Sequence, residues 1–166
     1  MNIRHWIVVV ALLAVFTSVT ASAVTREEAE ARLEEIASWG TMDGTWEGQY
    51  KIVFKPEGGE DPDTEIVNAK VVLSEGKASF YIALPGEEFS PVSEGFPFQA
   101  NELFAKLQVV RSGGAWIESW MVDLSRESKN QAKLFLLRTV NNWAGEAPPT
   151  GSVFAVVGIG SFSRAE

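Results

Sequence analysis

The chain has 166 residues, of which 46% are hydrophobic, with 14 basic residues, 22 acidic residues, one histidine and no cysteine. Its formal net charge of −8 argues against nucleic acid as a partner and against electrostatic docking to an anionic membrane. Because the one histidine, His5, lies in the N-terminal leader, the rest of the chain lacks the residues for Ser-His-Asp or Cys-His catalysis, histidine-ligated haem and the usual zinc and copper sites, and we expect no metal and no cofactor.

Residues 1–23 have the pattern of a secretory signal peptide. Arg4 precedes an apolar run over 6–16, and the small-residue motif ASA at 21–23 is one that signal peptidase accepts. The apolar run is shorter than the roughly 20 residues that span a bilayer, so a retained N-terminal anchor is only the alternative. We expect cleavage after Ala23, a periplasmic or secreted location, no stable membrane span after cleavage, and one domain in the remainder.

Residues 24–40 predict one amphipathic helix. Thr25 and Glu28 have the spacing of a capping box, and Gly40 is suited to end the helix. Apolar residues between them recur at helical spacing, so that one stripe of the helix should lie on an apolar surface. These residues are Ala29, Leu33, Ile36 and Ala37.

From residue 44 onward the apolar period changes from 3.6 to 2, which predicts β-strands. The connectors are rich in Gly, Pro, Asp, Asn and Ser, and no long helical crossover separates the strands, so an antiparallel meander is expected. Strands of this length favour a small closed up-and-down barrel over 44–166. Between the third and fourth of these strands, 85–98 is expected to be a lid or a loop that folds its aromatic side chains onto the core. The seven predicted strands are 45–55, 64–73, 77–84, 101–111, 115–124, 131–140 and 152–163.

Two short motifs at opposite ends of the barrel region resemble a known group. Gly44-Thr45-Trp46 is similar to the G-x-W motif in the first strand of the calycins, the group of lipocalins and fatty-acid-binding proteins, and Arg164, directly after the last predicted strand, stands where the group has an arginine. The resemblance implies that Trp46 packs near Arg164 in a structural role and that the barrel holds a small ligand. The lipocalin C-terminal helix and disulfide are missing, and seven strands are predicted in place of eight or ten.

A second resemblance is shorter. Gly158-Ile-Gly-Ser-Phe162, followed by Ala165, is similar to the G-x-G-x-F-x-x-A segment of dirigent and allene-oxide-cyclase barrels. That likeness implies an isomerase or cyclase that would use carboxylate or tyrosine chemistry.

The hairpin around Gly113-Gly114 has a pattern from which a register can be predicted. A two-residue primed turn at these glycines pairs Ser112 with Ala115. Under that register the larger apolar side chains of both strands share one face, and Glu118 is among them. The expected pairs are Arg111–Trp116, Val109–Glu118, Leu107–Trp120 and Ala105–Val122.

Glu118 is therefore expected to point inward between Trp116 and Trp120. An inward carboxylate needs a partner, and the next strand offers Arg138 on its own apolar face, while Arg111 could reach Glu118 diagonally. Two interpretations stay open. Either these charges form a buried ion pair that closes a polar network in the core, or they line a cavity and hold the head group of an amphiphile, as the fatty-acid-binding resemblance implies.

We expect the protein to bind a small apolar or amphipathic molecule inside the barrel, without catalysing a reaction. The first alternative is a structural or interaction barrel whose core is filled by its own side chains. The second is an isomerase that uses Glu118 with Tyr50 as acid and base. An outer-membrane barrel fits less well because Glu118 and Arg138 would face lipid. The expected ligand-binding residues are Arg138, Glu118, Arg111, Trp116, Trp120 and Tyr50.

Overall fold

A computed structural model describes residues 24–54, 66–113, 116–142 and 153–165. The predicted signal peptide lies outside these residues. The chain forms two compact units that divide between Glu34 and Glu35, and helix α2 (Arg26–Ser38) crosses this boundary.

Helix α2 begins with the predicted capping box. The Glu28 amide donates to Thr25 Oγ1 at 3.2 Å, and the Thr25 amide donates to Glu28 Oε2 at 2.8 Å. Gly40 follows the helix with a φ of +70°, the left-handed conformation that ends many helices. None of the α2 residues is buried, and the expectation that its apolar stripe lies on an apolar surface stays a prediction.

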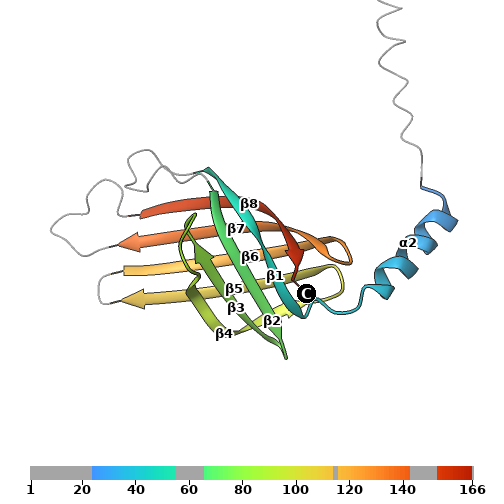
Figure 1. The fold of residues 1–166 in the computed structure, drawn as a ribbon, viewed down its shortest axis with the longest axis horizontal. Helices are drawn as coiled ribbons and strands as arrows, with labels where there is room; N and C mark the ends of the chain where they lie inside the picture. Colours follow the sequence, from blue (N-terminus) through green and yellow to red (C-terminus); the bar gives the residue numbers. More distant parts are fainter. Residues whose placement is uncertain (1–23, 55–65, 114–115, 143–152, 166) are drawn as a thin grey trace, which may run out of the picture. The chain divides into compact units, whose positions relative to one another are not determined.

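Eight antiparallel strands follow, each hydrogen-bonded to the next, and the last returns to the first to close a barrel (Figure 1). The predicted class, mainly β with a closing meander, is confirmed. The strands are β1 (Gly44–Phe54), β2 (Ile66–Ser74), β3 (Lys77–Ala83), β4 (Ser90–Ala100), β5 (Phe104–Gly113), β6 (Trp116–Ser128), β7 (Gln131–Asn142) and β8 (Val153–Arg164).

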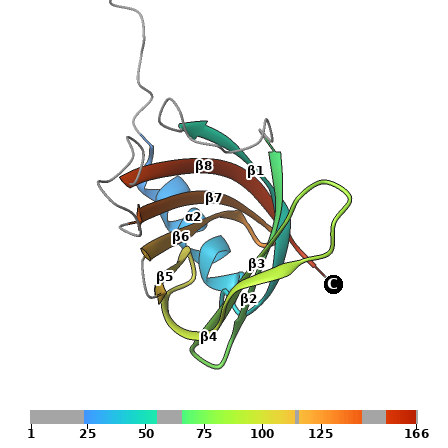
Figure 2. The ribbon, with the colours of Figure 1, turned by 90° about the vertical axis from the view of Figure 1, so that its left-hand side faces the viewer.

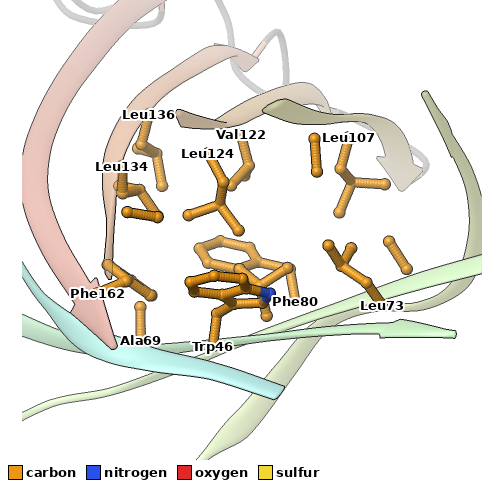
Figure 3. Close-up of a cluster of buried hydrophobic side chains, with 14 of the residues drawn as sticks. Trp46, Ala69, Leu73, Phe80, Leu107, Val122, Leu124, Leu134, Leu136 and Phe162 are labelled. Carbon is orange, nitrogen blue, oxygen red and sulfur yellow. The ribbon is translucent and has the colours of Figure 1, made fainter. Parts of the chain in front are cut away.

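The alternating apolar and polar residues of each strand point to the inside and the outside of the barrel. In β1, Trp46 and Tyr50 are buried inside the barrel, whereas Glu47 and Lys51 face outward and are exposed. Alternate side chains of a strand point to opposite faces, so the apolar set of every strand meets in one core. Figure 3 shows part of this core, where side chains from β1, β2, β3, β5, β6, β7 and β8 converge.

Strand β4 corrects the prediction of seven strands with a loop over 85–98. The segment carries Pro91, Gly95 and Pro97, which usually punctuate loops. Here they lie where the pairing of β4 with β3 is irregular: the register shifts twice around Phe80, and Gly95 adopts a φ of +69°. Bulges allow such residues within a strand, and β4 closes the barrel by pairing with β5 over a short stretch, Phe98 to Ala100.

The hairpin register was predicted two residues away from the observed one. Gly113 pairs with Trp116, and the two residues between them lie outside the described residues. A shift of two leaves every side chain on its predicted face, which is why alternation could not reveal the error. Gly113 serves a different purpose from the one predicted, because a Cβ there would lie 2.4 Å from the Trp116 indole nitrogen. The observed pairs are Arg111–Glu118, Val109–Trp120, Leu107–Val122 and Ala105–Leu124.

Glycines also allow β1 and β8 to approach closely. A Cβ on Gly48 would lie 2.1 Å from the Ser161 carbonyl oxygen, and a Cβ on Gly160 would lie 2.2 Å from the Gln49 carbonyl oxygen. Neighbouring Gly158 leaves room for the Tyr50 ring, which would be 2.5 Å from a Cβ at that position. The glycines of the GIGSF segment therefore have a packing role at the seam that closes the barrel.

Candidate functional site

One end of the barrel is closed around a buried cation. Arg126 is 6% exposed, and its guanidinium donates to the carbonyl oxygens of Trp39 at 3.0 Å, Gly40 at 2.8 Å, Glu102 at 3.3 Å and Lys129 at 2.7 Å. Burial, followed by repulsion from nearby Arg164, lowers the pKa of Arg126 below its ordinary value. These hydrogen bonds tie the segment after α2 and the two adjacent turns to one side chain.

Trp46 lies at the centre of the same closed end. Its indole Nε1 donates to the Met42 carbonyl oxygen at 2.8 Å, and both side chains are fully buried. The guanidinium carbons of Arg126 and Arg164 lie 5.7 and 5.6 Å from the Trp46 ring centroid, and Arg164 also donates to the Asp43 carbonyl. The expected proximity of Trp46 and Arg164 is therefore present, since they are also paired across β1 and β8.

The opposite end contains a cavity of about 100 Å³. Its lining residues come from β1, β2, β3, β6, β7 and β8 or lie just beyond them, and Figure 2 shows these strands around the barrel. Its walls are mostly apolar, and polar atoms come from one tyrosine, one tryptophan and one arginine. The lining residues are Tyr50, Ile52, Val67, Ile82, Leu84, Trp120, Leu136, Arg138 and Val156.

Glu118 is paired with two arginines beside this cavity. The carboxylate is 7% exposed. Arg138 donates to Glu118 Oε2 from Nε at 3.0 Å and from Nη2 at 2.9 Å, whereas Arg111 Nη1 lies 3.6 Å from Oε1. The predicted contact between Glu118 and Arg138 is present. The diagonal approach expected of Arg111 is wrong, because the observed register puts Arg111 directly opposite Glu118 and makes Arg138 the diagonal neighbour.

Arg138 connects the ion pair with the cavity. Its guanidinium carbon lies 4.8 Å from the ring centroid of Trp120, the residue directly opposite it on β6. Stacking on an indole while bonded to a carboxylate holds the guanidinium plane in place. The cavity therefore has one charged wall whose charge is already compensated by Glu118.

The structure divides the six expected ligand-binding residues into two groups. Tyr50, Trp120 and Arg138 line the cavity, whereas Glu118, Arg111 and Trp116 are not among its described lining residues. Glu118 and Arg111 can act on a ligand only through Arg138 or at the rim. An acid–base pair of Tyr50 and Glu118 would need both groups at one cavity, and only Tyr50 lines it.

Sequence reasoning missed one part of this arrangement. Arg126 lies on the inward face of β6, in phase with Leu124, but the predicted strand ended at residue 124. Leu84 lies just beyond β3 and lines the cavity, and the predicted strand over 77–84 included it. Among the other lining residues, those of β1, β6 and β7 lie on the faces that were predicted to be inward.

Within the described ranges, no group of three or more acidic, histidine or cysteine side chains could hold a metal ion. The acidic stretch from Glu57 to Glu65 lies outside those ranges. None of the described helices is both long and apolar enough to cross a membrane.

The chain has a distant structural likeness to a solved protein. No protein-family model matches the chain, and no curated protein matches it. The solved structure of EF1p2_mFAP2b bound to DFHBI is similar at 9% sequence identity, with 79% of this chain and 98% of that chain covered and a TM-score of 0.40. A likeness this distant carries no argument about a ligand.

Proposed function

We propose that the protein is an exported binding module that holds a small apolar or amphipathic molecule at the open end of its barrel. The supporting observation is the contrast between the two ends. One is sealed by Met42, Trp46 and Arg126, while the other has an apolar cavity with Arg138 in its wall. Apolar pockets with a few placed polar groups are the usual form of small-molecule sites.

The export part of the proposal rests on the leader alone. The motif at 21–23 and the short apolar run before it are typical of a cleaved signal peptide. Sequencing the N-terminus of protein recovered from a secreting host tests it, since a first residue of Val24 is expected.

A calycin-like relationship is also part of the proposal. It is supported by the Trp46–Arg164 contact at the closed end and by eight strands in consecutive order. Either feature could arise without common ancestry, because contacts between arginine and tryptophan rings are common in proteins.

Ligand binding can be tested by filling the cavity. Val156 is 5% exposed and lines the cavity, whereas its neighbour Val157 faces outward. Native mass spectrometry of protein purified without detergent should reveal a small co-purifying mass, and a fluorescent fatty acid should bind. Both signals should be lost in Val156→Phe and kept in Val157→Phe, the same substitution one residue away on the other face.

A filled structural barrel is the second candidate, and the size of the cavity favours it. At about 100 Å³ it is smaller than the roughly 300–1,000 Å³ of pockets that enclose drug-sized ligands. A ligand would therefore insert one end and leave the rest at the mouth. If no mass co-purifies and no apolar probe binds to the unsubstituted protein, the filled barrel is the correct description.

A further inference from the structure

Strand β5 is paired along its whole length on one side and over a short stretch on the other. All of β5 is paired with β6, whereas its pairing with β4 ends at Leu107. The Phe104 carbonyl accepts from the Asn101 amide at 3.0 Å, so it points to the β4 side. The backbone groups of every second residue point to the same side of a strand, and those beyond Leu107 therefore point away from β6. The residues in this phase are Gln108, Val110 and Ser112.

The pairing between β4 and β5 ends at a proline. Leu107 lies opposite Phe98, so the same register would put Pro97 opposite Gln108. Proline has no N–H group to donate to the Gln108 carbonyl, and two residues earlier Gly95 adopts a φ of +69°. A surface hollow of about 240 Å³ lies at this point, with Pro97 and Gln108 among its lining residues. The hollow marks the start of an open edge.

The rest of this edge is accessible. Gln108, Val110 and Ser112 are all exposed, Val110 by 53%, and none of the described residues pairs with their backbone on this side. Native edge strands are often protected by proline, lysine or an inward charge. Beyond Leu107, β5 has neither proline nor lysine, and its one charged residue is Arg111. An edge of this kind can bind an extended peptide as an added strand.

Arg111 indicates which strand the edge would accept. Its side chain is 44% exposed and lies 3.6 Å from Glu118 Oε1, while Glu118 Oε2 accepts two hydrogen bonds from Arg138. If the pairing of β4 continued in register, Glu94 would lie opposite Arg111. The Glu94 carboxylate instead accepts from the Tyr81 hydroxyl at 3.0 Å. The position opposite Arg111 is therefore one that an acidic residue of another strand would fit.

We propose that the open edge of β5 binds an extended acidic segment of a partner protein, which pairs with Gln108, Val110 and Ser112 and puts a carboxylate opposite Arg111. A second copy of this chain fits the edge less well. Residues 108–113 contain no acidic residue, and antiparallel self-pairing would bring two Arg111 side chains to one interface without a counter-charge. The inference does not depend on the proposed ligand of the cavity.

The probe is an acetylated and amidated peptide of alternating valine and threonine with one central glutamate. Matched peptides carry glutamine or lysine at the central position. Each is added at up to millimolar concentration to the ¹⁵N-labelled protein while amide resonances and hydrogen exchange are followed. In the free protein the amides of Gln108, Val110 and Ser112 should exchange rapidly, whereas those of Val109 and Arg111, which face β6, should exchange slowly.

The glutamate peptide should slow exchange of the three edge amides by about tenfold at saturation. It should bind about five times more tightly than the glutamine peptide, and the lysine peptide should bind most weakly. Arg111→Gln should remove the preference for glutamate, whereas Arg26→Gln, at a 91% exposed side chain of α2, should keep it. Val110→Pro removes an edge N–H group and no bond to β6, so it should prevent binding. If that variant does not fold, Arg111→Gln decides.

Three results would overturn the proposal: slow exchange of the edge amides in the free protein, no protection of them by any of the peptides, or equal affinity for the glutamate and glutamine peptides. If sedimentation shows a dimer in which these amides are protected, the occupant is a second copy and the acidic-peptide proposal is wrong. Binding of a fluorescent fatty acid is measured separately, so a failure at this edge leaves the proposed function standing.

Discussion

Arg138 directs two of its nitrogen atoms at a single oxygen of Glu118, with Nε at 3.0 Å and Nη2 at 2.9 Å. The two residues are diagonal neighbours on β6 and β7, and the intervening position is occupied by Trp120, on which the guanidinium stacks. The carboxylate is buried and the arginine side chain is 32% exposed. Because the carboxylate is buried and the arginine is only partly exposed, water screens this ion pair only in part.

Removing both members of this pair should cost less than the sum of the two single losses. Glu118→Gln should lower the free energy of unfolding by about 2 kcal/mol, because it removes the charge that both arginines face. Arg138→Met should lower it by about 1–2 kcal/mol, because it removes both hydrogen bonds to Glu118 Oε2. The double variant should lose less than the sum, with a coupling energy of at least about 1 kcal/mol. Urea unfolding of the four proteins measures the coupling, and additive losses would contradict a direct contact.

Arg126 should contribute strongly to stability despite being a buried charge. Arg126→Met leaves the carbonyls of Trp39, Gly40, Glu102 and Lys129 without their donor, and we expect a loss of about 3 kcal/mol. Arg26→Met is the control, because that side chain is 91% exposed in an i,i+4 pair and should change stability by less than about 0.5 kcal/mol. Equal effects of the two substitutions in urea unfolding would show that the carbonyl bonds are dispensable.

The seam between β1 and β8 should not tolerate a methyl group. In Gly48→Ala the new Cβ would meet the backbone oxygen of Ser161 at 2.1 Å, and backbone cannot move aside as a side chain can. We expect a loss of about 3 kcal/mol or more. Gly76→Ala, in the turn between β2 and β3, meets nothing within 4 Å and should lose only about 1 kcal/mol for its φ of +74°. Thermal unfolding should place the two variants in this order, and the reverse order would mean that the seam can relax.

Most of the fold could be predicted because period-2 alternation is a local property. Seven strands and the capped helix follow from residues that are neighbours in sequence. Strand β4 did not, since Pro91, Gly95 and Pro97 have the composition of a loop, and the strand that contains them pairs irregularly with β3. The prediction of the hairpin register was wrong for a related reason. Gly113 leaves room for the Trp116 indole across the strand pair, so this glycine reflects a tertiary contact and not a turn preference.

The sequence predicted which candidate site residues point into the barrel, but not which of them line the cavity. Alternation correctly put Tyr50, Trp120 and Arg138 on the inward face, and they line the cavity. Glu118 and Arg111 are in the same phase, yet neither is among the described lining residues. Whether an inward residue meets a cavity or other side chains depends on how the barrel is filled at each level, and this is decided by residues far apart in sequence.

Acid should loosen the start of α2 in a defined pH range. The Thr25 amide, and secondarily its hydroxyl, donates to the Glu28 carboxylate and lowers the Glu28 pKa below its ordinary value of 4.5. Because the folded-state pKa is the lower one, the stabilisation is fully present above 4.5 and is lost as the pH falls through the lowered value. NMR titration of the Glu28 side chain should give a pKa below 4.5, with the Thr25 amide resonance moving at the same midpoint. Thr25→Ala should raise the pKa only in part, because the larger contribution comes from the backbone amide, whereas an unchanged pKa would mean that the hydroxyl contributes nothing.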